Sequence, residues 1–369
     1  MTKILTVLGA RPQFIKASVV SAAIGRRPGL TETVVHTGQH FDSNMSDVFF
    51  EELGMAAPAH HLDIHGGSHG EMTGRMLAAL EAVMLEERPD AVLVYGDTNS
   101  TLAGALATVK LHLPVAHVEA GLRSFNLRMP EEVNRILTDR ISRWLFTPTQ
   151  AATGNLLRES MPAEAIEQVG DVMYDVALHH GKRVSEHGGA LQRLGLPAGG
   201  YVLATVHRAE NTDHPQRLAT IVQALAQAGR ERPVVWPLHP RTRKLLAGQG
   251  LLAALEKQVR LTDPVGYLDM VQLEKFAALI ATDSGGVQKE AFFHRVPCVT
   301  LRDETEWVEL VDAGWNHLAP PHSAAGIVAA IARALEQRPQ EIRPYGNGDA
   351  AERIAARLAA SHIQQNDQT

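Results

Sequence analysis

The 369-residue chain is predicted to be an α/β protein of two doubly wound domains that face a cleft. Two observations predict this class. Short apolar runs alternate with helix-like stretches along the chain, and one Gly-, Pro- and Ala-rich stretch at residues 186–200 interrupts the alternation. Alternation of this kind indicates parallel strands joined by right-handed helical crossovers. A cleft between two such domains is the default place for a ligand.

The first half, residues 1–180, is predicted to form one domain. Its apolar runs predict strands at Ile4–Leu8, Thr33–His36, Ala91–Val94, Val115–Val118 and Trp144–Phe146. Helices are predicted in the gaps at Pro12–Ile24, Glu71–Glu87, Asn99–Lys110 and Pro130–Ser142. An amphipathic helix at residues 349–363 is expected to pack back on this domain.

The second half, residues 181–348, repeats the pattern. Its strands are predicted at Tyr201–Thr205, Val234–Pro237, Ala278–Ala281 and Cys298–Leu301. Its helices are predicted at Arg217–Ala228, Gly286–Phe293 and Gly326–Glu336. The boundary between the two domains is expected shortly before or inside residues 186–200.

The composition places the chain among ordinary globular proteins. It is 45% hydrophobic and 21% charged, with a net charge of −6, which argues against nucleic acid as a main partner. No signal-peptide layout and no apolar stretch of membrane-spanning length is visible, so no membrane insertion is expected. The single cysteine, Cys298, follows Pro297 in an apolar run and is expected in the core. A chain without an internal disulfide predicts a cytoplasmic protein.

Acidic residues follow two neighbouring strands of the first half. Asp97 follows the third predicted strand, and Glu119 follows the fourth. Ligands bind at the carboxyl ends of strands in open α/β sheets, and close acids shift each other's pKa values apart into proton donor and acceptor. With Glu131, which follows Pro130, they predict proton-transfer chemistry. The alternative is that these acids only cap helices, which does not explain acids at two neighbouring strand ends.

The turn after the first strand is a candidate phosphate site. It reads Gly-Ala-Arg-Pro-Gln at residues 9–13, and the following helix carries Lys16. A glycine turn lets backbone approach an anion, a helix N-terminus is partly positive, and Arg11 adds a fork of donors. An ordinary turn with a solvated arginine is the alternative. Neither a dinucleotide-binding nor a P-loop glycine motif occurs, so a nicotinamide cofactor lacks its fingerprint.

A second candidate phosphate site reads Thr-Asp-Ser-Gly-Gly-Val-Gln-Lys-Glu at residues 282–290. Gly285 and Gly286 permit close approach, and the Ser284 hydroxyl lies beside the free amides of a helix start, an arrangement that fits a diphosphate. Glu290, one turn into the helix, would accept from ribose hydroxyls. The alternative is that Asp283 or Ser284 merely caps the helix.

Two histidines follow strands of the second half. His207, when protonated, would stabilise a departing diphosphate. His239 would face the same cleft, although a lone histidine is often structural. His61, His65 and His69 are spaced four apart, but the glycines among them disfavour a continuous helix face, and no metal site is predicted.

Together, these motifs resemble the non-hydrolysing UDP-N-acetylglucosamine 2-epimerase family. The resemblance spans about residues 3–320, and the matching segments are residues 9–12, 36–40, 96–98, 117–123, 130–135, 207–211 and 283–290. It implies a glycosyltransferase-B-like fold of two Rossmann-like domains, with UDP in the cleft. It also implies a homodimer that needs neither a metal nor a nicotinamide cofactor.

The resemblance also implies a reaction and its residues. The family inverts C2 of the sugar by eliminating UDP to a 2-acetamidoglycal and adding it back, which requires an acid–base pair at C2 and help for the leaving diphosphate. The family's catalytic positions correspond to Asp97, Glu119, Glu131 and His207. The UDP-sugar-binding positions correspond to Arg11, Lys16, Arg135, His239, Ser284, Gly285, Gly286 and Glu290. Which acid removes the proton and which returns it stays open.

Departures from the family pattern bear on the substrate. The family's Arg-Pro-Glu reads Arg-Pro-Gln at residues 11–13, and its Glu-Glu reads Lys-Glu at 289–290. Each change removes an acid, which suits a substrate with an extra carboxylate. The whole pattern, including residues 44–46 and 72–76, is most similar to the branch that epimerises UDP-2,3-diacetamido-2,3-dideoxy-glucuronate for bacterial surface polysaccharide. The Arg-Gln pair of members activated by UDP-N-acetylglucosamine is missing from residues 65–70.

Other functions remain as alternatives. UDP-N-acetylglucosamine is the alternative substrate of a 2-epimerase. A glycosyltransferase on the same fold, a hydrolysing epimerase and a non-catalytic nucleotide-sugar sensor are the more remote candidates, because a fold alone does not fix the chemistry.

Overall fold

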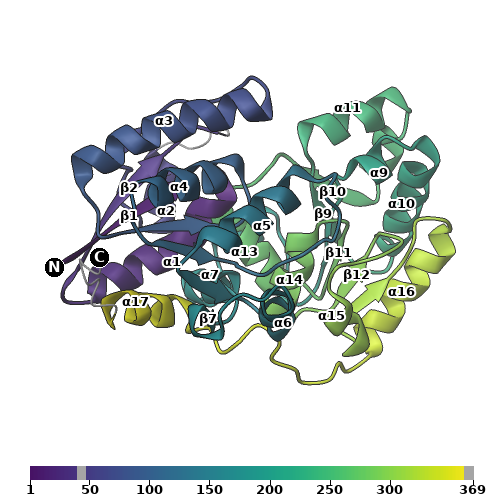
Figure 1. Cartoon of the computed structure of the whole chain (residues 1–369). Helices are drawn as coiled ribbons and strands as arrows, with labels where there is room; N and C mark the ends of the chain where they lie inside the picture. Colours follow the sequence, from purple (N-terminus) through teal and green to yellow (C-terminus); the bar gives the residue numbers. More distant parts are fainter. Residues whose placement is uncertain (40–46, 361–369) are drawn as a thin grey trace. The chain divides into compact units, whose positions relative to one another are not determined.

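The structure is a computed structural model that describes residues 1–39 and 47–360. It contains two compact units (Figure 1). The amino-terminal unit comprises residues 1–176 and the segment from residue 343 onward, and the carboxy-terminal unit comprises residues 177–342. Each unit is an α/β sandwich around one parallel sheet, as predicted. His40, the segment 44–46 and the predicted helix end at 361–363 lie outside the described residues.

Seven parallel strands form the sheet of the amino-terminal unit, in the order β3-β2-β1-β4-β5-β6-β7. They are β1 (Thr2–Leu8), β2 (Leu30–His36), β3 (His60–His61), β4 (Ala91–Tyr95), β5 (Val115–Val118), β6 (Trp144–Thr147) and β7 (Ile166–Gln168). Central strands such as β4 are buried throughout, because helices cover both faces of a parallel sheet. In the β4–β5 register Tyr95 pairs with Val118, so these two strands end side by side.

Helices cover this sheet on both faces (Figure 1). On one face α1 (Arg11–Arg26) packs against α17 (Ala350–Ala360), and on the other α4 (Asn99–Lys110) packs between α3 (His69–Glu87) and α5 (Pro130–Ile141). The remaining elements are α2 (Asp47–Leu53), α6 (Gln150–Arg158) and the 3-10 turn Ala163–Ala165. The helix α7 (Val172–Gly181) runs across the boundary between the units.

The carboxy-terminal unit has six parallel strands in the order β10-β9-β8-β11-β12-β13. They are β8 (Val202–Thr205), β9 (Val234–Pro237), β10 (Val259–Thr262), β11 (Leu279–Thr282), β12 (Cys298–Thr300) and β13 (Asn316–Leu318). The helices are α8 (Gly189–Arg193), α9 (Ala209–Thr212), α10 (Pro215–Ala228), α11 (Pro240–Gly248), α12 (Leu252–Leu255), α13 (Tyr267–Lys275), α14 (Gly285–Phe293), α15 (Val308–Asp312) and α16 (Ala324–Glu336). The stretch 186–200 lies wholly inside this unit and contains α8.

The four strands that the sequence did not predict are the edge strands of the two sheets. β3 and β7 flank the first sheet, and β10 and β13 flank the second. Each is two to four residues long and partly exposed. An edge strand pairs on one side only and lacks the continuous apolar run that identifies a buried parallel strand.

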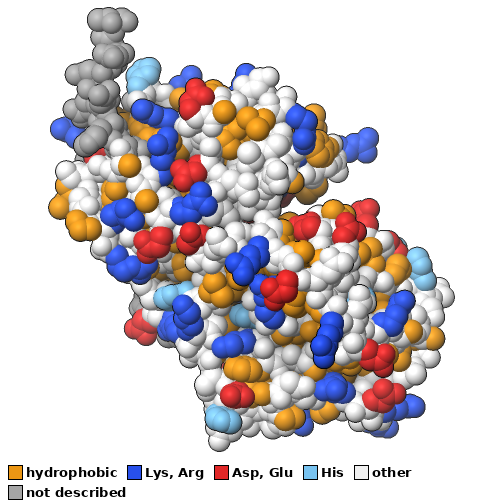
Figure 2. Space-filling view, turned by 90° about the horizontal axis from the view of Figure 1, so that it is seen from below, with side chains coloured by type: hydrophobic (Ala, Val, Ile, Leu, Met, Phe, Trp, Pro, Cys, Tyr) orange, Lys and Arg blue, Asp and Glu red, His pale blue; other side chains and the backbone are white. Residues whose placement is uncertain are grey.

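The surface is of mixed charge. Figure 2 shows Lys and Arg side chains interspersed with Asp and Glu on the face drawn. Within residues 1–39 and 47–360, no helix has the length and apolar character needed to span a membrane. Cys298 is fully buried in β12, as expected of a core residue, and burial raises the pKa of its thiol to about 12.

Candidate active site

Two of the predicted acids lie together at the carboxyl edge of the amino-terminal sheet. Asp97 follows β4, Glu119 follows β5, and these strands are neighbours. A side chain at Gly96 would place its Cβ 3.3 Å from Oε2 of Glu119, so that carboxylate lies against the residue before Asp97. Glu119 itself has a φ of 71°, in the left-handed region that non-glycine residues seldom adopt. Backbone strain of this kind gathers at functional sites.

Asp97 interacts electrostatically with the other two acids. Burial raises the pKa of Asp97, Arg135 lowers it, and Glu119 and Glu131 raise it again, so it ends above its usual value. Glu131 is exposed in the first turn of α5. The structure therefore places Glu119 and Glu131 close enough to Asp97 to raise its pKa.

Lys16 forms an ion pair with Glu119. Its side chain comes from α1 and is mostly buried. Burial lowers the pKa of Lys16, but attraction to Glu119 and the hydrogen bond that Lys16 donates to it raise the pKa more, and Asp171 and Asp97 raise it further. Lys16, expected to bind UDP, thus contacts one of the predicted catalytic acids.

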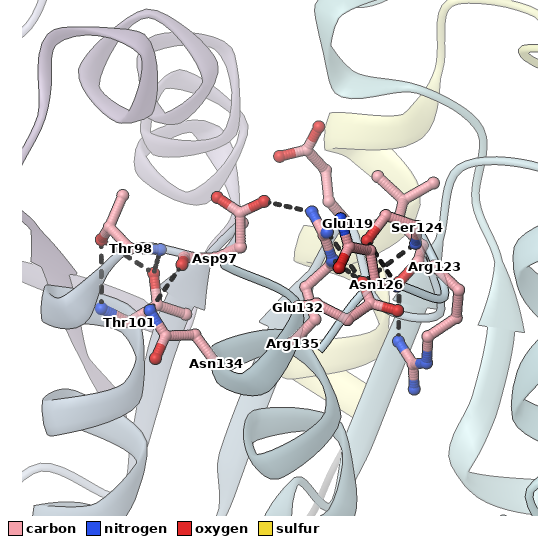
Figure 3. Close-up of polar contacts among 12 residues, drawn as sticks. Asp97, Thr98, Thr101, Glu119, Arg123, Ser124, Asn126, Glu132, Asn134 and Arg135 are labelled. Carbon is pink, nitrogen blue, oxygen red and sulfur yellow. Dashed lines mark hydrogen bonds and ion pairs between the residues drawn. The ribbon is translucent and has the colours of Figure 1, made fainter. Parts of the chain in front are cut away.

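Arg135, from the second turn of α5, joins Asp97 to a buried acid. Its Nη1 lies 2.5 Å from Oδ2 of Asp97, and its Nη2 lies 2.8 Å from Oε2 of Glu132 (Figure 3). Glu132 is 1% exposed and also accepts from the backbone N–H groups of Ser124 and Phe125. The predicted substrate-binding Arg135 is thereby fixed against Asp97 by a second carboxylate.

The glycine turn after β1 is closed by a side chain. The Oε1 atom of Gln13 accepts from the N–H groups of Gly9 (2.8 Å) and Ala10 (3.1 Å). These two amides are therefore not offered to a phosphate as the turn had suggested. Arg11 is the first residue of α1 and is half-buried at the helix start.

In the carboxy-terminal unit, a buried carboxylate organises the loop after β8. Asp283 is 0% exposed and accepts from the backbone N–H groups of His207 (3.1 Å) and Arg208 (3.0 Å) and from Nδ2 of Asn211 (3.1 Å). The side chain of His207 is half exposed, with Nδ1 3.7 Å from Oδ1 of Asp283. The structure thus places His207 beside the predicted diphosphate turn.

The diphosphate turn itself lies between β11 and α14. Ser284 is the N-cap of α14, and its hydroxyl accepts from the N–H of Val287 (3.5 Å). A Cβ at Gly285 would have Arg208 Nη2 3.7 Å away, and one at Gly286 would meet only Ser284 Oγ, at 3.9 Å. The capping interpretation is therefore correct for Ser284. The Glu306 carboxylate lies as close to a Cβ at Gly285 as the Arg208 guanidinium does, with Oε2 also 3.7 Å away.

Glu290, the predicted ribose contact, lies within hydrogen-bond distance of a second carboxyl group. Glu274 on α13 is 2% exposed. Burial, repulsion by Glu290 and a hydrogen bond to it raise the pKa of Glu274 well above its usual range. Burial and the neighbouring Glu290 carboxyl therefore both favour the protonated form of Glu274.

His239 is the N-cap of α11. Its Nδ1 accepts from the backbone N–H of Arg241 at 3.2 Å, so its proton lies on the exposed Nε2. The structural and the functional interpretations are compatible, since one ring nitrogen caps the helix and the other points away from it.

Two of the departures from the family pattern are internal. Gln13 is 3% exposed and Lys289 is 8% exposed, with its Nζ 4.5 Å from the ring centre of Trp307. Both side chains are buried. The structure therefore shows no direct way for Gln13 or Lys289 to contact an extra carboxylate on the substrate.

Sequence reasoning did not single out Gln13, Glu132, Asn211, Glu274 or Asp283 as site residues. Asp283 had the clearest signal, because it follows an apolar run within a quoted motif. No sequence signal pairs Gln13 or Glu274 with their distant partners. Across residues 1–39 and 47–360, no three His, Cys, Asp or Glu side chains gather as metal ligands would.

The fold and the site define a class of protein: a two-unit parallel α/β enzyme with a carboxylate cluster on one sheet and a glycine turn before a helix on the other. The sequence model of the UDP-N-acetylglucosamine 2-epimerase family matches residues 22–359, and the chain belongs to this family. Its structural neighbours are UDP-N-acetylglucosamine 2-epimerases, and its fold is glycosyltransferase-B-like.

Two known proteins and one solved structure illustrate the relationship. The UDP-2,3-diacetamido-2,3-dideoxy-D-glucuronate 2-epimerase of Pseudomonas aeruginosa is 56% identical over 97% of this chain and 99% of its own length. The UDP-N-acetylglucosamine 2-epimerase of Methanocaldococcus jannaschii is 43% identical over 95% of this chain and 97% of its own. A structure of the latter with UDP-GlcNAc and UDP has a TM-score of 0.82 and covers 97% of this chain and 99% of its own.

Proposed function

We propose that this protein is a UDP-sugar 2-epimerase that converts UDP-2,3-diacetamido-2,3-dideoxy-D-glucuronate to the mannuronate. The observation that carries the substrate is the 56% identity over nearly the whole length of the Pseudomonas aeruginosa enzyme named for that sugar. The product serves bacterial surface polysaccharide. The second candidate substrate, UDP-N-acetylglucosamine, is favoured by the 43% identity to the archaeal enzyme named for it.

The proposed reaction has two halves. A carboxylate removes the C2 proton while the C1–O bond breaks, so that UDP leaves with the electron pair and a C1=C2 double bond forms. A proton then reaches the opposite face of C2, and UDP adds back to C1. The amino-terminal unit supplies the acids, and the carboxy-terminal unit supplies Ser284, Gly285, Gly286 and Glu290 for UDP, with His207 at the leaving diphosphate.

We assign different starting roles to the two strand-end acids. Glu119 forms an ion pair with Lys16, and a carboxylate in such a pair is suited to accept the C2 proton of the gluco substrate. Asp97, whose pKa is raised by burial and by Glu119, is suited to deliver the proton on the other face. Glu131, exposed nearby, is the third acid of the reaction in this proposal.

The test is incubation with each UDP-sugar in D2O, followed by NMR of the C2 configuration. Epimerisation of the uronate with deuterium at C2 is expected. Turnover of UDP-N-acetylglucosamine alone would overturn the substrate. Sugar transfer without C2 deuterium, release of free sugar, or binding without turnover would identify a glycosyltransferase, a hydrolase or a sensor instead.

Two variants test the roles of the acids. Asp97→Asn is expected to accumulate glycal and UDP from the gluco substrate, because elimination proceeds and re-protonation does not. Glu119→Gln is expected to stop elimination, with a fall in kcat of about 10²–10⁴-fold. The reverse pattern would exchange the two assignments. Glu86→Gln, an exposed acid on α3, is the matched control and should retain wild-type turnover.

We also propose a homodimer located in the cytoplasm. Five apolar side chains on α5 and in the loop before it are exposed: Phe125, Leu127, Met129, Val133 and Leu137. The last three are spaced four residues apart, from the N-cap of α5 along the helix. Together they offer an apolar surface that a second copy of the chain would cover. Light scattering should give twice the monomer mass, and Val133→Lys should lower it. The buried, unpaired Cys298 fits a reducing compartment.

A further inference from the structure

The turn that carries Asp97 is held by side chains at three successive backbone carbonyls. The donors come from three different elements: Gln13 Nε2 to Tyr95 O (2.7 Å), His117 Nε2 to Gly96 O (2.7 Å) and Asn134 Nδ2 to Asp97 O (2.9 Å). Figure 3 shows Asn134 reaching Asp97 from α5. Among these donors, only His117 belongs to the strand that also leads to Glu119.

His117 is 0% exposed, and both of its ring nitrogens face acceptors. Nε2 lies 2.7 Å from Gly96 O, which has no proton to give, and Nδ1 lies 2.7 Å from Oδ1 of Asp139. A neutral imidazole donates through one nitrogen only. Both bonds are therefore satisfied together either by an imidazolium or by a protonated Asp139.

The partners of Asp139 decide between these two states. Its Oδ2 accepts from the N–H of Gly121 (3.1 Å) and from Nη1 of Arg123 (2.7 Å). Burial raises the pKa of Asp139, but His117 and Arg123 lower it more, and the net shift is downward. Arg123 is in turn paired with Glu159. The carboxyl is thus ionised, and the proton between it and His117 resides on the ring.

The His117–Asp139 pair reaches both strand-end turns. His117 holds the carbonyl of Gly96, which directly precedes Asp97, and Asp139 holds the N–H of Gly121, two residues after Glu119. Gly121 has a φ of 81°, and a Cβ there would lie 2.4 Å from Ala152 O, so this close-packed turn accepts only glycine. The pair is therefore a rigid link between the backbones that carry the two acids.

We propose that His117 is a positioning residue, held as a buried imidazolium by Asp139, that sets the separation of Asp97 and Glu119. This inference rests on the proposed function for its catalytic consequence. Its structural part does not depend on the proposed function. This part is a doubly protonated His117 ring that is held by Asp139, which in turn is linked to Arg123 and Glu159. A buried cation of this kind is stable only while its hydrogen-bonded partners stay in place.

The structural part is tested on the wild-type protein with 15N-labelled histidine. The His117 signal, assigned by its loss in His117→Gln, is expected to show N–H groups on both nitrogens, because each nitrogen faces an acceptor. An unprotonated nitrogen at about pH 7 would overturn the proposal. This readout does not depend on activity.

The catalytic part is tested by kinetics. His117→Gln and Asp139→Asn are expected to lower kcat by about 10-fold to 100-fold with little change in KM, because they shift the acids and leave the UDP-binding residues intact. The control is His60→Gln, which removes another His–carboxylate pair of this unit (Nε2 to Glu87 Oε1, 2.6 Å). Unchanged kcat in a folded His117→Gln protein would refute the positioning role, whereas an inactive wild type would refute the proposed function.

Discussion

Lys16 and Glu119 form an ion pair at the carboxyl edge of the amino-terminal sheet, between the first helix and the end of β5. The Glu119 backbone has a left-handed conformation. Glu119 thereby combines conformational strain, a mostly buried position and a charged partner. This combination supports its assignment as a catalytic residue of the proposed reaction.

Removing the Lys16 ammonium should slow catalysis. In Lys16→Met, the Glu119 carboxylate loses its ion-pair partner. We expect kcat to fall by about 10-fold to 100-fold, because the carboxylate is no longer held in position. The measurement is kcat for the UDP-sugar. Lys110→Met, which removes an exposed lysine at the end of α4, should keep the wild-type kcat, and an equal fall in both variants would contradict the assignment.

A methyl group at Gly96 should disturb the site in two ways. The residue has a φ of 64°, and its Cβ would crowd Oε2 of Glu119 at 3.3 Å. Gly96→Ala should therefore lower stability by about 1 kcal/mol and kcat by about 10-fold or more. Gly74→Ala is the matched control, because Gly74 lies exposed in α3 with open space around it, and it should raise the melting temperature without affecting kcat. Equal kcat in the two variants would show that the Gly96 contact is unimportant.

Replacing Asp283 by Asn should loosen the loop that carries His207. The amide would turn one NH2 group toward N–H donors that now meet a carboxylate. We expect a loss of about 1–3 kcal/mol in the free energy of unfolding and weaker binding of UDP, measured by calorimetry. The control is Asp213→Asn, an exposed partner of Arg241, which should change stability by less than about 0.5 kcal/mol. UDP affinity that is retained in Asp283→Asn would separate this carboxylate from ligand binding.

Asp175 should make the protein less stable as the pH rises. It is 7% exposed and accepts from the N–H of Ala351 at the start of α17, and burial raises its pKa to about 6 from 3.8. The folded state therefore binds this proton more tightly than the unfolded state, and the advantage is lost between about pH 4 and pH 6. Asp175→Asn should stabilise the protein by roughly 1–3 kcal/mol at about pH 8 and by little below pH 4. Urea unfolding at the two pH values checks this, and a gain of the same size at both would contradict it.

The interior of both sheets could be predicted from the sequence, and their edges could not. Val115–Val118 and Val234–Pro237 were placed correctly as β5 and β9, because a strand covered on both faces needs an unbroken apolar run. β3 and β13 have no such run, since one side of each is free of a neighbouring strand. An apolar run identifies a strand only when the strand is buried, so partly exposed edge strands are missed.

In the candidate site, the strand-end acids could be predicted from the sequence, and the contacts that hold them could not. Asp97 and Glu119 were predictable, because each follows a recognisable strand and neighbouring parallel strands end at one edge. The contacts that hold them were not predictable. Gln13 reaches Tyr95 across 82 positions of the chain, and no local pattern encodes such a pairing. The contact of Gln13 with the N–H groups of Gly9 and Ala10 was not predictable either, although the three residues are close in the sequence.

Because α17 packs against α1, truncation of the chain before α17 should affect the folding of the amino-terminal unit. Arg26 reaches Glu352 at 2.6 Å, and Ile354 and Leu358 are buried in the unit that carries the candidate acids. A stop codon after residue 342 would leave every strand of both sheets and every candidate acid in place. It would remove α17, however, and so expose the apolar face of α1 that α17 covers. Late nonsense alleles should accordingly behave as nulls through misfolding.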